Sequence, residues 1–356
     1  MSYFVIIPEL ILTGPTKGAA ALANGLVFKN RIVHLIVLKG GYQFLEKLNI
    51  SKSVNIHILK GSKIKKLKKF KNLVYEYRPK FRISMGFSAD VLNFLFKAGF
   101  SKSISSVRAN LFINYYLDYG FSGKLLAFVH YKIISKFEVV LSMTESMKLE
   151  LKSNLGIDSA LIGNFIDEAA ISKLQKKGKE EETFYFSYVG TLSERKNVIF
   201  LIESFINFSK SKSNVKLLIA GDGPLKEKVT SLIENFEDKI EYLGFIDSPY
   251  DLLAKSHVFV LLSSSEGMSR AALEALFLGN IGLLSMVEGN SELIEDGENG
   301  YLYDKDIHNI EECFEKSYHM VKNKPKSIKS HIPDRFNQNI QVSKLVKLLE
   351  NHVQDE

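Results

Sequence analysis

The fold is decided by the stretch Ser263-Ser264-Ser265-Glu266-Gly267-Met268-Ser269-Arg270-Ala271-Ala272-Leu273-Glu274-Ala275-Leu276-Phe277-Leu278-Gly279. An apolar run at 258–262 precedes it and predicts a buried strand. After the serines, alanines and leucines recur at helical spacing and stop at Gly279, which predicts a helix. The order is therefore strand, polar turn, helix. In an open parallel sheet such a turn lies where ligands bind, and free N–H groups at the helix start favour an anion.

Two carboxylates bracket this stretch, and two interpretations fit each of them. Glu266, in the turn, can face a ligand at the mouth of the helix or merely stabilise the helix start. Glu274, expected two turns into the helix, can accept hydrogen bonds from vicinal hydroxyls or can be a solvated surface residue. These residues alone leave both questions open.

Outward from this stretch, strands and helices alternate through 356 residues, enough for two domains with hydrophobic cores. The single cysteine, Cys313, excludes an internal disulfide framework and is typical of a reducing cytosol. There is no run of about 18 apolar residues, and the first residues indicate a strand rather than a signal peptide. We therefore expect a cytoplasmic protein without a membrane span.

Charge is divided unevenly along the chain. Residues 1–168 carry 24 Lys and Arg against 11 Asp and Glu, a net charge of +13, whereas residues 169–356 carry 23 against 29, or −6. This asymmetry predicts that the first half meets an anionic surface, and the absence of a nucleic-acid-binding motif argues against DNA or RNA. Residues 63–71 contain six lysines on an amphipathic helical pattern. That helix can pack its apolar stripe on a sheet or dock on anionic lipid.

Glycines and basic residues follow several predicted strands. In the first half, Gly14 lies in an expected turn at 13–18, and Arg108 ends a strand where it can hold a phosphate oxygen or form a surface ion pair. In the second half, Gly190 is followed by Arg195 and Lys196. These two cations can neutralise the charge of a departing nucleoside diphosphate, whereas a basic helix start without an anion is electrostatically unfavourable.

Several segments together resemble retaining glycosyltransferases of family 4. They are the Glu266-to-Glu274 spacing, the turn from Gly190 to Asn197, Gly221-Asp222-Gly223-Pro224-Leu225, Gly289-Asn290-Ser291-Glu292-Leu293 and Asn299-Gly300-Tyr301-Leu302. The resemblance implies the α/β fold called GT-B, with two Rossmann-like doubly wound domains facing an interdomain cleft. It implies an acceptor-side domain at 1–168, a linker at 169–183, a nucleotide-sugar-binding domain at 184–332, and a closing helix within 333–356 that packs back on the first domain.

The resemblance also implies an activity: transfer of a sugar, with retention of configuration and without a metal ion, from a nucleotide-sugar to a hydroxyl group. UDP is the first expected nucleotide and GDP the second. The acceptor would be a polyprenyl-diphosphate-linked saccharide in bacterial surface polysaccharide (O-antigen, lipopolysaccharide or capsule) assembly, met by a peripheral protein on the inner face of the cytoplasmic membrane. No cofactor is expected, because the nucleotide-sugar is a substrate.

By the same resemblance, the catalytic residues are Glu266, Arg195, Lys196 and Arg108. The donor site comprises Gly14, Gly190, Arg195, Lys196, Gly221, Phe245, Ile246, Glu266, Gly267, Met268, Ser269 and Glu274. Within it, Glu266 would contact the sugar hydroxyls and Glu274 the ribose. Two other classes stay open: a nucleotide-sugar epimerase or hydrolase, which acts on the donor with no acceptor present, and a non-catalytic scaffold, which would bind no nucleotide.

Overall fold

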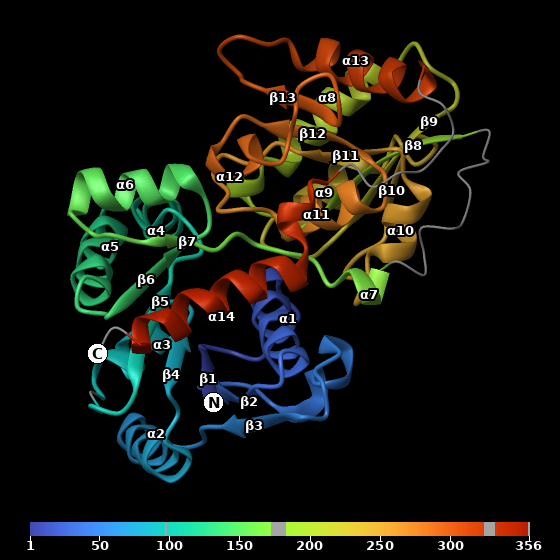
Figure 1. Cartoon of the computed structure of the whole chain (residues 1–356). Coiled ribbons are helices and arrows are strands. Elements are labelled where there is room, and N and C mark those ends of the chain that lie inside the picture. Colours follow the sequence, from blue (N-terminus) through green and yellow to red (C-terminus); the bar gives the residue numbers. More distant parts are fainter. Residues whose placement is uncertain (97, 172–182, 324–331, 355–356) are drawn as a thin grey trace. The chain divides into compact units, whose positions relative to one another are not determined.

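The computed structural model describes residues 1–96, 98–171, 183–323 and 332–354, and the chain forms two compact units (Figure 1). Unit 1 contains Met1–Ile166 and Arg335–Glu356, and unit 2 contains Asp167–Asp334. Each unit has one parallel sheet with helices packed on it, which confirms the predicted pair of Rossmann-like domains. Most of the linker predicted at 169–183 lies outside the described residues.

Unit 1 is built on a seven-stranded parallel sheet in the order β3-β2-β1-β4-β5-β6-β7. Its strands are β1 (Ser2–Ile7), β2 (Ile32–Val37), β3 (Val54–Ile58), β4 (Phe81–Ser84), β5 (Lys102–Ser106), β6 (Val139–Ser142) and β7 (Ala160–Leu161). The central strand β1 is buried along almost its whole length, as expected for a parallel strand covered on both faces.

Seven α-helices of unit 1 are described. They are α1 (Gly14–Phe28), α2 (Lys63–Tyr77), α3 (Phe87–Phe94), α4 (Leu111–Tyr119), α5 (Phe121–Ile134), α6 (Glu145–Leu155) and α14 (Gln338–Gln354), with short 3-10 turns at Tyr42–Phe44, Glu46–Leu48 and Asp334–Phe336. The expected turn at 13–18 is wrong, because α1 already begins at Gly14. Pro15 explains the early start, since proline is well suited to the first helical turn.

The sheet of unit 1 has a core on each face. One core contains side chains of α1 and α14, including Leu22 and Val342. The other contains Phe70 and Val74 of α2, which pack with Phe4 of β1. The apolar stripe predicted on the lysine-rich helix is therefore buried at Phe70 and Val74, whereas Ile64 at its start is exposed together with most of the lysines.

The C-terminal helix α14 packs on α1 within unit 1. Gly25 of α1 allows the close approach, because a Cβ there would lie 2.7 Å from a methyl group of Val342. Arg31 makes a two-pronged ion pair with Glu350 at 2.9 and 3.0 Å. The helix is longer than the 340–349 pattern indicated.

Unit 2 has a six-stranded parallel sheet in the order β10-β9-β8-β11-β12-β13. Its strands are β8 (Phe184–Val189), β9 (Val215–Ala220), β10 (Ile240–Tyr242), β11 (Val258–Leu261), β12 (Ile281–Ser285) and β13 (Gly300–Tyr303). The chain leaves β8 toward β9 and returns from β10 to β11 on the other side of β8. The strand order therefore reverses between β8 and β11, which is where open α/β sheets bind ligands.

The helices of unit 2 are α7 (Glu168–Ile171), α8 (Val198–Ser209), α9 (Lys226–Ile233), α10 (Tyr250–Lys255), α11 (Arg270–Phe277), α12 (Glu288–Ser291) and α13 (Ile310–Asn323), with a 3-10 turn at Glu194–Lys196. Four phenylalanines, Phe186, Phe205, Phe208 and Phe314, join β8, α8 and α13 with ring centroids 5.2 to 5.9 Å apart. In the described part of the chain, no helix is both long and apolar enough to cross a lipid bilayer.

Candidate functional site

Two loops meet at the strand reversal of unit 2. One follows β8 and contains Gly190, Arg195 and Lys196, and the other follows β11 and runs from Leu262 to Ser269. Both leave the carboxyl ends of neighbouring strands, so their polar side chains are brought together although some seventy residues separate them in sequence. The sequence motifs predicted that each of the two loops carries residues of the donor site.

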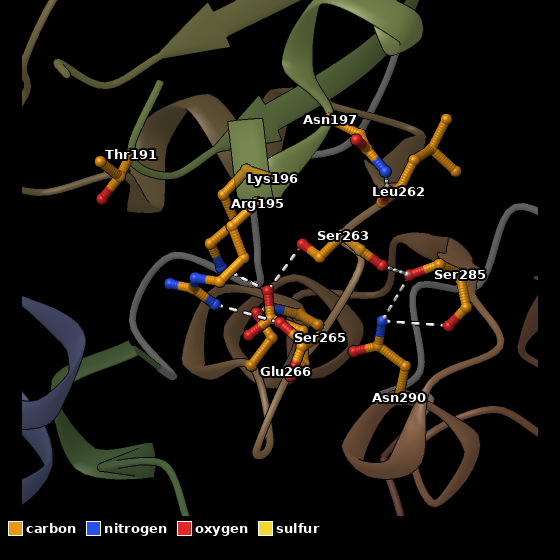
Figure 2. Close-up of polar contacts among 12 residues, drawn as sticks. Thr191, Arg195, Lys196, Asn197, Leu262, Ser263, Ser265, Glu266, Ser285 and Asn290 are labelled. Atoms are coloured by element: carbon orange, nitrogen blue, oxygen red, sulfur yellow. Dashed lines mark hydrogen bonds and ion pairs between the residues drawn. The ribbon is translucent and has the colours of Figure 1, made fainter. Parts of the chain in front are cut away.

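The centre of this site is an ion pair between Lys196 and Glu266 (Figure 2). The Nζ atom of Lys196 contacts Oε1 of Glu266, and the same oxygen accepts a hydrogen bond from Ser263 Oγ at 2.7 Å. Both charged side chains are largely buried. Glu266 lies four residues before α11, whose first turn is capped by Ser269, and it faces the cation of the other loop.

Further hydrogen bonds fix the two loops to each other. Arg195 donates from Nη1 to the carbonyl oxygen of Ser265 at 3.0 Å, and its own carbonyl accepts from the N–H of Ser264 at 2.8 Å. Asn197 donates to the carbonyl oxygen of Leu262 at 2.9 Å and adopts a left-handed conformation with φ of 50°. Asparagine tolerates this conformation, which turns the chain from the 3-10 turn into α8.

Glycines permit the close backbone approaches around the site. A Cβ on Gly221 would lie 1.8 Å from the carbonyl oxygen of Gly190, and Gly221 has φ of 153°. A Cβ on Gly289 would lie 1.8 Å from the carbonyl oxygen of Gly267. Any side chain at Gly221 or Gly289 would therefore push these loops apart. The ligand contacts predicted for Gly190, Gly221 and Gly267 stay predictions; the structure shows Gly221 packed on the carbonyl of Gly190, and Gly289 on that of Gly267.

A second polar cluster surrounds Glu274 on α11. The helix begins after Ser269, whose Oγ accepts from the N–H of Ala272 at 3.3 Å. One turn along, Oε1 of Glu274 accepts from Nε of Arg270 at 2.9 Å and from the hydroxyl of Tyr250 at 3.5 Å. Glu274 is 3% exposed, so it is not a solvated surface residue. It also lies one helical turn from the start of α11, not two as expected.

Tyr188 and Tyr250 support the site, although neither was predicted from the sequence to do so. Tyr188, on β8, is fully buried and donates its hydroxyl to the carbonyl oxygen of Thr191 at 2.8 Å, which holds the loop after Gly190. Burial, reinforced by the negative charge of Glu266, raises the pKa of Tyr188 far above its usual value. Burial and then Glu274 likewise raise the pKa of Tyr250.

The remaining predicted residues of unit 2 lie on the flanks of this centre. Phe245 and Ile246 follow β10, and the loop that carries them is tied to the site through the N–H of Gly221, which donates to the carbonyl of Gly244 at 2.8 Å. Phe245 is exposed. Met268 is buried in the loop that precedes α11.

Gly14 and Arg108 belong to unit 1. Gly14 is the first residue of α1, with open space where a Cβ would lie. Arg108 follows β5 and donates from Nη2 to Oδ1 of Asn164 at 3.0 Å, close to Gly18 of α1. Their predicted contacts with donor or acceptor phosphates stay predictions.

Within residues 1–96, 98–171, 183–323 and 332–354, no three His, Cys, Asp or Glu side chains gather closely enough to hold a metal ion. The expectation that the reaction needs no metal ion stays a prediction.

Residues 171–339 match the family model described as "Glycosyl transferases group 1". Among curated relatives, an uncharacterized glycosyltransferase of Methanocaldococcus jannaschii is 29% identical, over 60% of this chain and 57% of the relative. The N-acetylgalactosamine-N,N'-diacetylbacillosaminyl-diphospho-undecaprenol 4-alpha-N-acetylgalactosaminyltransferase of Campylobacter jejuni is 27% identical, over 54% of each chain.

A solved structure shares the fold over the whole length. Anabaena HepE in complex with UDP superimposes with a TM-score of 0.74 at 18% identity, covering 99% of this chain and 100% of that one. By contrast, the alignments to the two curated relatives span just over half the length of each.

Proposed function

Because the chain belongs, through residues 171–339, to the group 1 glycosyltransferases, we propose that it is a retaining glycosyltransferase that moves a sugar from a UDP-sugar to a hydroxyl group. The observation that carries the proposal is the meeting of Lys196 and Glu266 at the strand reversal of unit 2. This places a cation, a carboxylate and Arg195 at the edge where a parallel sheet binds its ligand.

Each of these side chains suits one part of a nucleotide-sugar. Lys196 and Arg195 neutralise the charge that a departing diphosphate gains when the glycosidic bond breaks. Glu266 accepts hydrogen bonds from the hydroxyls of the donor sugar once Lys196 turns to the phosphates. Glu274 accepts from the ribose hydroxyls through Oε2, because Arg270 and Tyr250 bond to Oε1. UDP is the preferred nucleotide, in line with the UDP bound to Anabaena HepE.

The proposed acceptor is a saccharide linked to a polyprenyl diphosphate, used in the assembly of a surface polysaccharide. The relative from Campylobacter jejuni, whose name specifies a diphospho-undecaprenol acceptor, supports this choice. So does charge, because unit 1 carries 27 Lys and Arg against 12 Asp and Glu, a net charge of +15. Such a unit is attracted to diphosphates and to the inner face of the cytoplasmic membrane, where the protein would act peripherally. No cofactor is required in this scheme.

The proposal is tested by incubating the protein with a panel of UDP- and GDP-sugars and a synthetic polyprenyl-diphosphate saccharide. Mass spectrometry should detect one added sugar, and NMR should show the anomeric configuration of the donor retained. Incubation with the donor alone separates the alternatives. Rapid consumption of the donor without acceptor would indicate an epimerase or hydrolase, and failure of any nucleotide to bind in calorimetry would indicate a scaffold.

A further inference from the structure

The outer face of helices α4 and α5 in unit 1 is unusually apolar. On α5, Phe121, Leu125 and Phe128 follow one another at helical spacing and are 83%, 68% and 52% exposed. Val129 of α5 and Ile113, Tyr116, Leu117 and Tyr119 of α4 are exposed as well. An ordinary surface helix is polar on the side that faces water, but α5 is apolar on both sides, because residues such as Ala127 and Ile134 fill its inner face.

The inner side of this helical pair is firmly held. Gly123 packs against the backbone of α4, since a Cβ there would lie 1.8 Å from the carbonyl oxygen of Tyr115. His130 of α5 bonds to Asp90 of α3 at 2.8 Å and to the hydroxyl of Tyr115 at 2.9 Å. These buried polar contacts fix the rotation of α5. The apolar residues on its other side are therefore presented to the outside and are not displaced core residues.

Lysines lie among and beside the exposed apolar residues. The Nζ atom of Lys124 lies 4.7 Å from the centroid of the Tyr116 ring, and Lys132 continues the helical row that begins at Phe121. Between residues 111 and 136 there are three lysines against one acidic residue, Asp118. Aromatic and aliphatic side chains next to lysines are the composition that suits the headgroup layer of an anionic bilayer, where the rings enter the interface and the ammonium groups meet lipid phosphates.

We propose that the outer face of α4 and α5 inserts into the headgroup region of an anionic lipid bilayer and forms the membrane contact of unit 1. The lysine-rich helix α2 can add long-range attraction but less insertion, because Phe70 and Val74 are buried in the core and its most exposed apolar residues, Ile64 and Tyr75, lie about three turns apart rather than in one row. A second copy of the chain is a poorer occupant, since a two-fold interface through this face would bring the same lysines together. The inference rests on the proposed function only for its purpose, access to a lipid-linked acceptor.

The chain contains no tryptophan, so one introduced indole reports its surroundings without background. The Phe121→Trp variant should shift its emission to shorter wavelength, and become protected from acrylamide, when vesicles of phosphatidylglycerol and phosphatidylcholine in equal parts are added. Phe28→Trp is the matched control, because Phe28 is equally exposed but ends α1. Its emission should not change.

A second experiment measures the contribution of the face. Replacing Phe121, Leu125 and Phe128 together with glutamine should weaken sedimentation with the same vesicles on the order of tenfold or more, because three apolar side chains no longer leave water. Glutamine at the similarly exposed Phe28, Ile32 and Ile64 should leave sedimentation unchanged. The residual binding of the α5 variant should vanish at 1 M salt, because only the attraction of the lysines remains and salt screens it.

The outcomes separate this inference from the proposed function. An unshifted Phe121→Trp on vesicles that bind the wild-type protein would overturn the inference, even if sugar transfer to a lipid-linked acceptor proceeds. A shift that needs no vesicles and grows with protein concentration would overturn it in favour of a second copy. If vesicle insertion is observed but no nucleotide-sugar is used, the inference stands and the proposed function fails.

Discussion

Glu274 offers the sharpest test of the donor site, and the structure decides which substitution is informative. Its carboxylate is 3% exposed and bonds to Arg270, which is itself 9% exposed. Glu274→Ala removes the charge partner of a buried guanidinium, a change that typically costs about 3–5 kcal/mol. A domain has only about 5–15 kcal/mol of stability. A weaker affinity of Glu274→Ala for UDP could therefore come either from the lost contact with the ribose or from partial unfolding of the domain.

Glu274→Gln keeps the volume and an oxygen acceptor for Arg270 but removes the negative charge. Two ribose hydroxyls would then lose a charged acceptor, which we expect to cost about 1.5–3 kcal/mol of UDP binding, or about 10- to 150-fold in Kd. The unfolding free energy should fall by less than in Glu274→Ala, because the buried hydrogen bond to Arg270 is retained in neutral form.

Isothermal titration calorimetry with UDP and chemical denaturation followed by circular dichroism measure the two quantities separately. Glu203→Gln is the control, because Glu203 is an exposed carboxylate on α8 of the same unit, and neither quantity should change. If Glu274→Gln binds UDP as tightly as the wild-type protein, Glu274 does not hold the ribose. If Glu274→Ala and the wild-type protein unfold at the same midpoint concentration of denaturant, the ion pair with Arg270 does not stabilise unit 2.

Three further predictions follow from the two units. Arg195→Ala combined with Lys196→Ala should lower turnover far more than helical content, and near-normal transfer rates would rule out their diphosphate role. Sugar transfer should survive excess EDTA; activity lost to EDTA and restored by manganese or magnesium would contradict the metal-free proposal. Burial, and then the neighbouring His57, lower the pKa of His34 to about 4. The unfolded chain then binds more protons between about pH 6.5 and 4, so unit 1 should lose up to about 3 kcal/mol of stability across that window. His34→Phe should flatten this profile, and a parallel profile would assign the loss to other groups.

The parts of the site that were predicted from sequence are those encoded by neighbouring residues in one short segment of the chain. Gly190 with Arg195 and Lys196 forms one continuous turn, and the helix before Gly279 shows a clear period, so period and turn chemistry suffice to place them. The strand alternation likewise predicted two parallel sheets. The contact of Tyr250 with Glu274 was not predictable, because it joins α10 to α11 and depends on how two helices pack.

The start of α1 and the outer face of α5 show two other limits. A turn-like composition at Gly14 and Pro15 concealed a helix start, because proline favours turns and first helical turns alike. Residues 121–134 are rich in apolar side chains, but periodicity cannot distinguish a helix buried on both sides from one that leaves a side uncovered. Only packing shows which residues remain exposed.

The ion pair between Lys196 and Glu266 joins the residue proposed to bind the diphosphate to the residue proposed to bind the donor sugar. Glu266 is held by Lys196 and Ser263. If a diphosphate draws Lys196 away, Glu266 keeps only the Ser263 hydroxyl of these two partners, and a buried carboxylate with too few hydrogen bonds is costly. Sugar hydroxyls would restore those bonds. The intact nucleotide-sugar should therefore bind more favourably than UDP alone, and this preference should disappear in Glu266→Ala, in which no carboxylate remains to be satisfied.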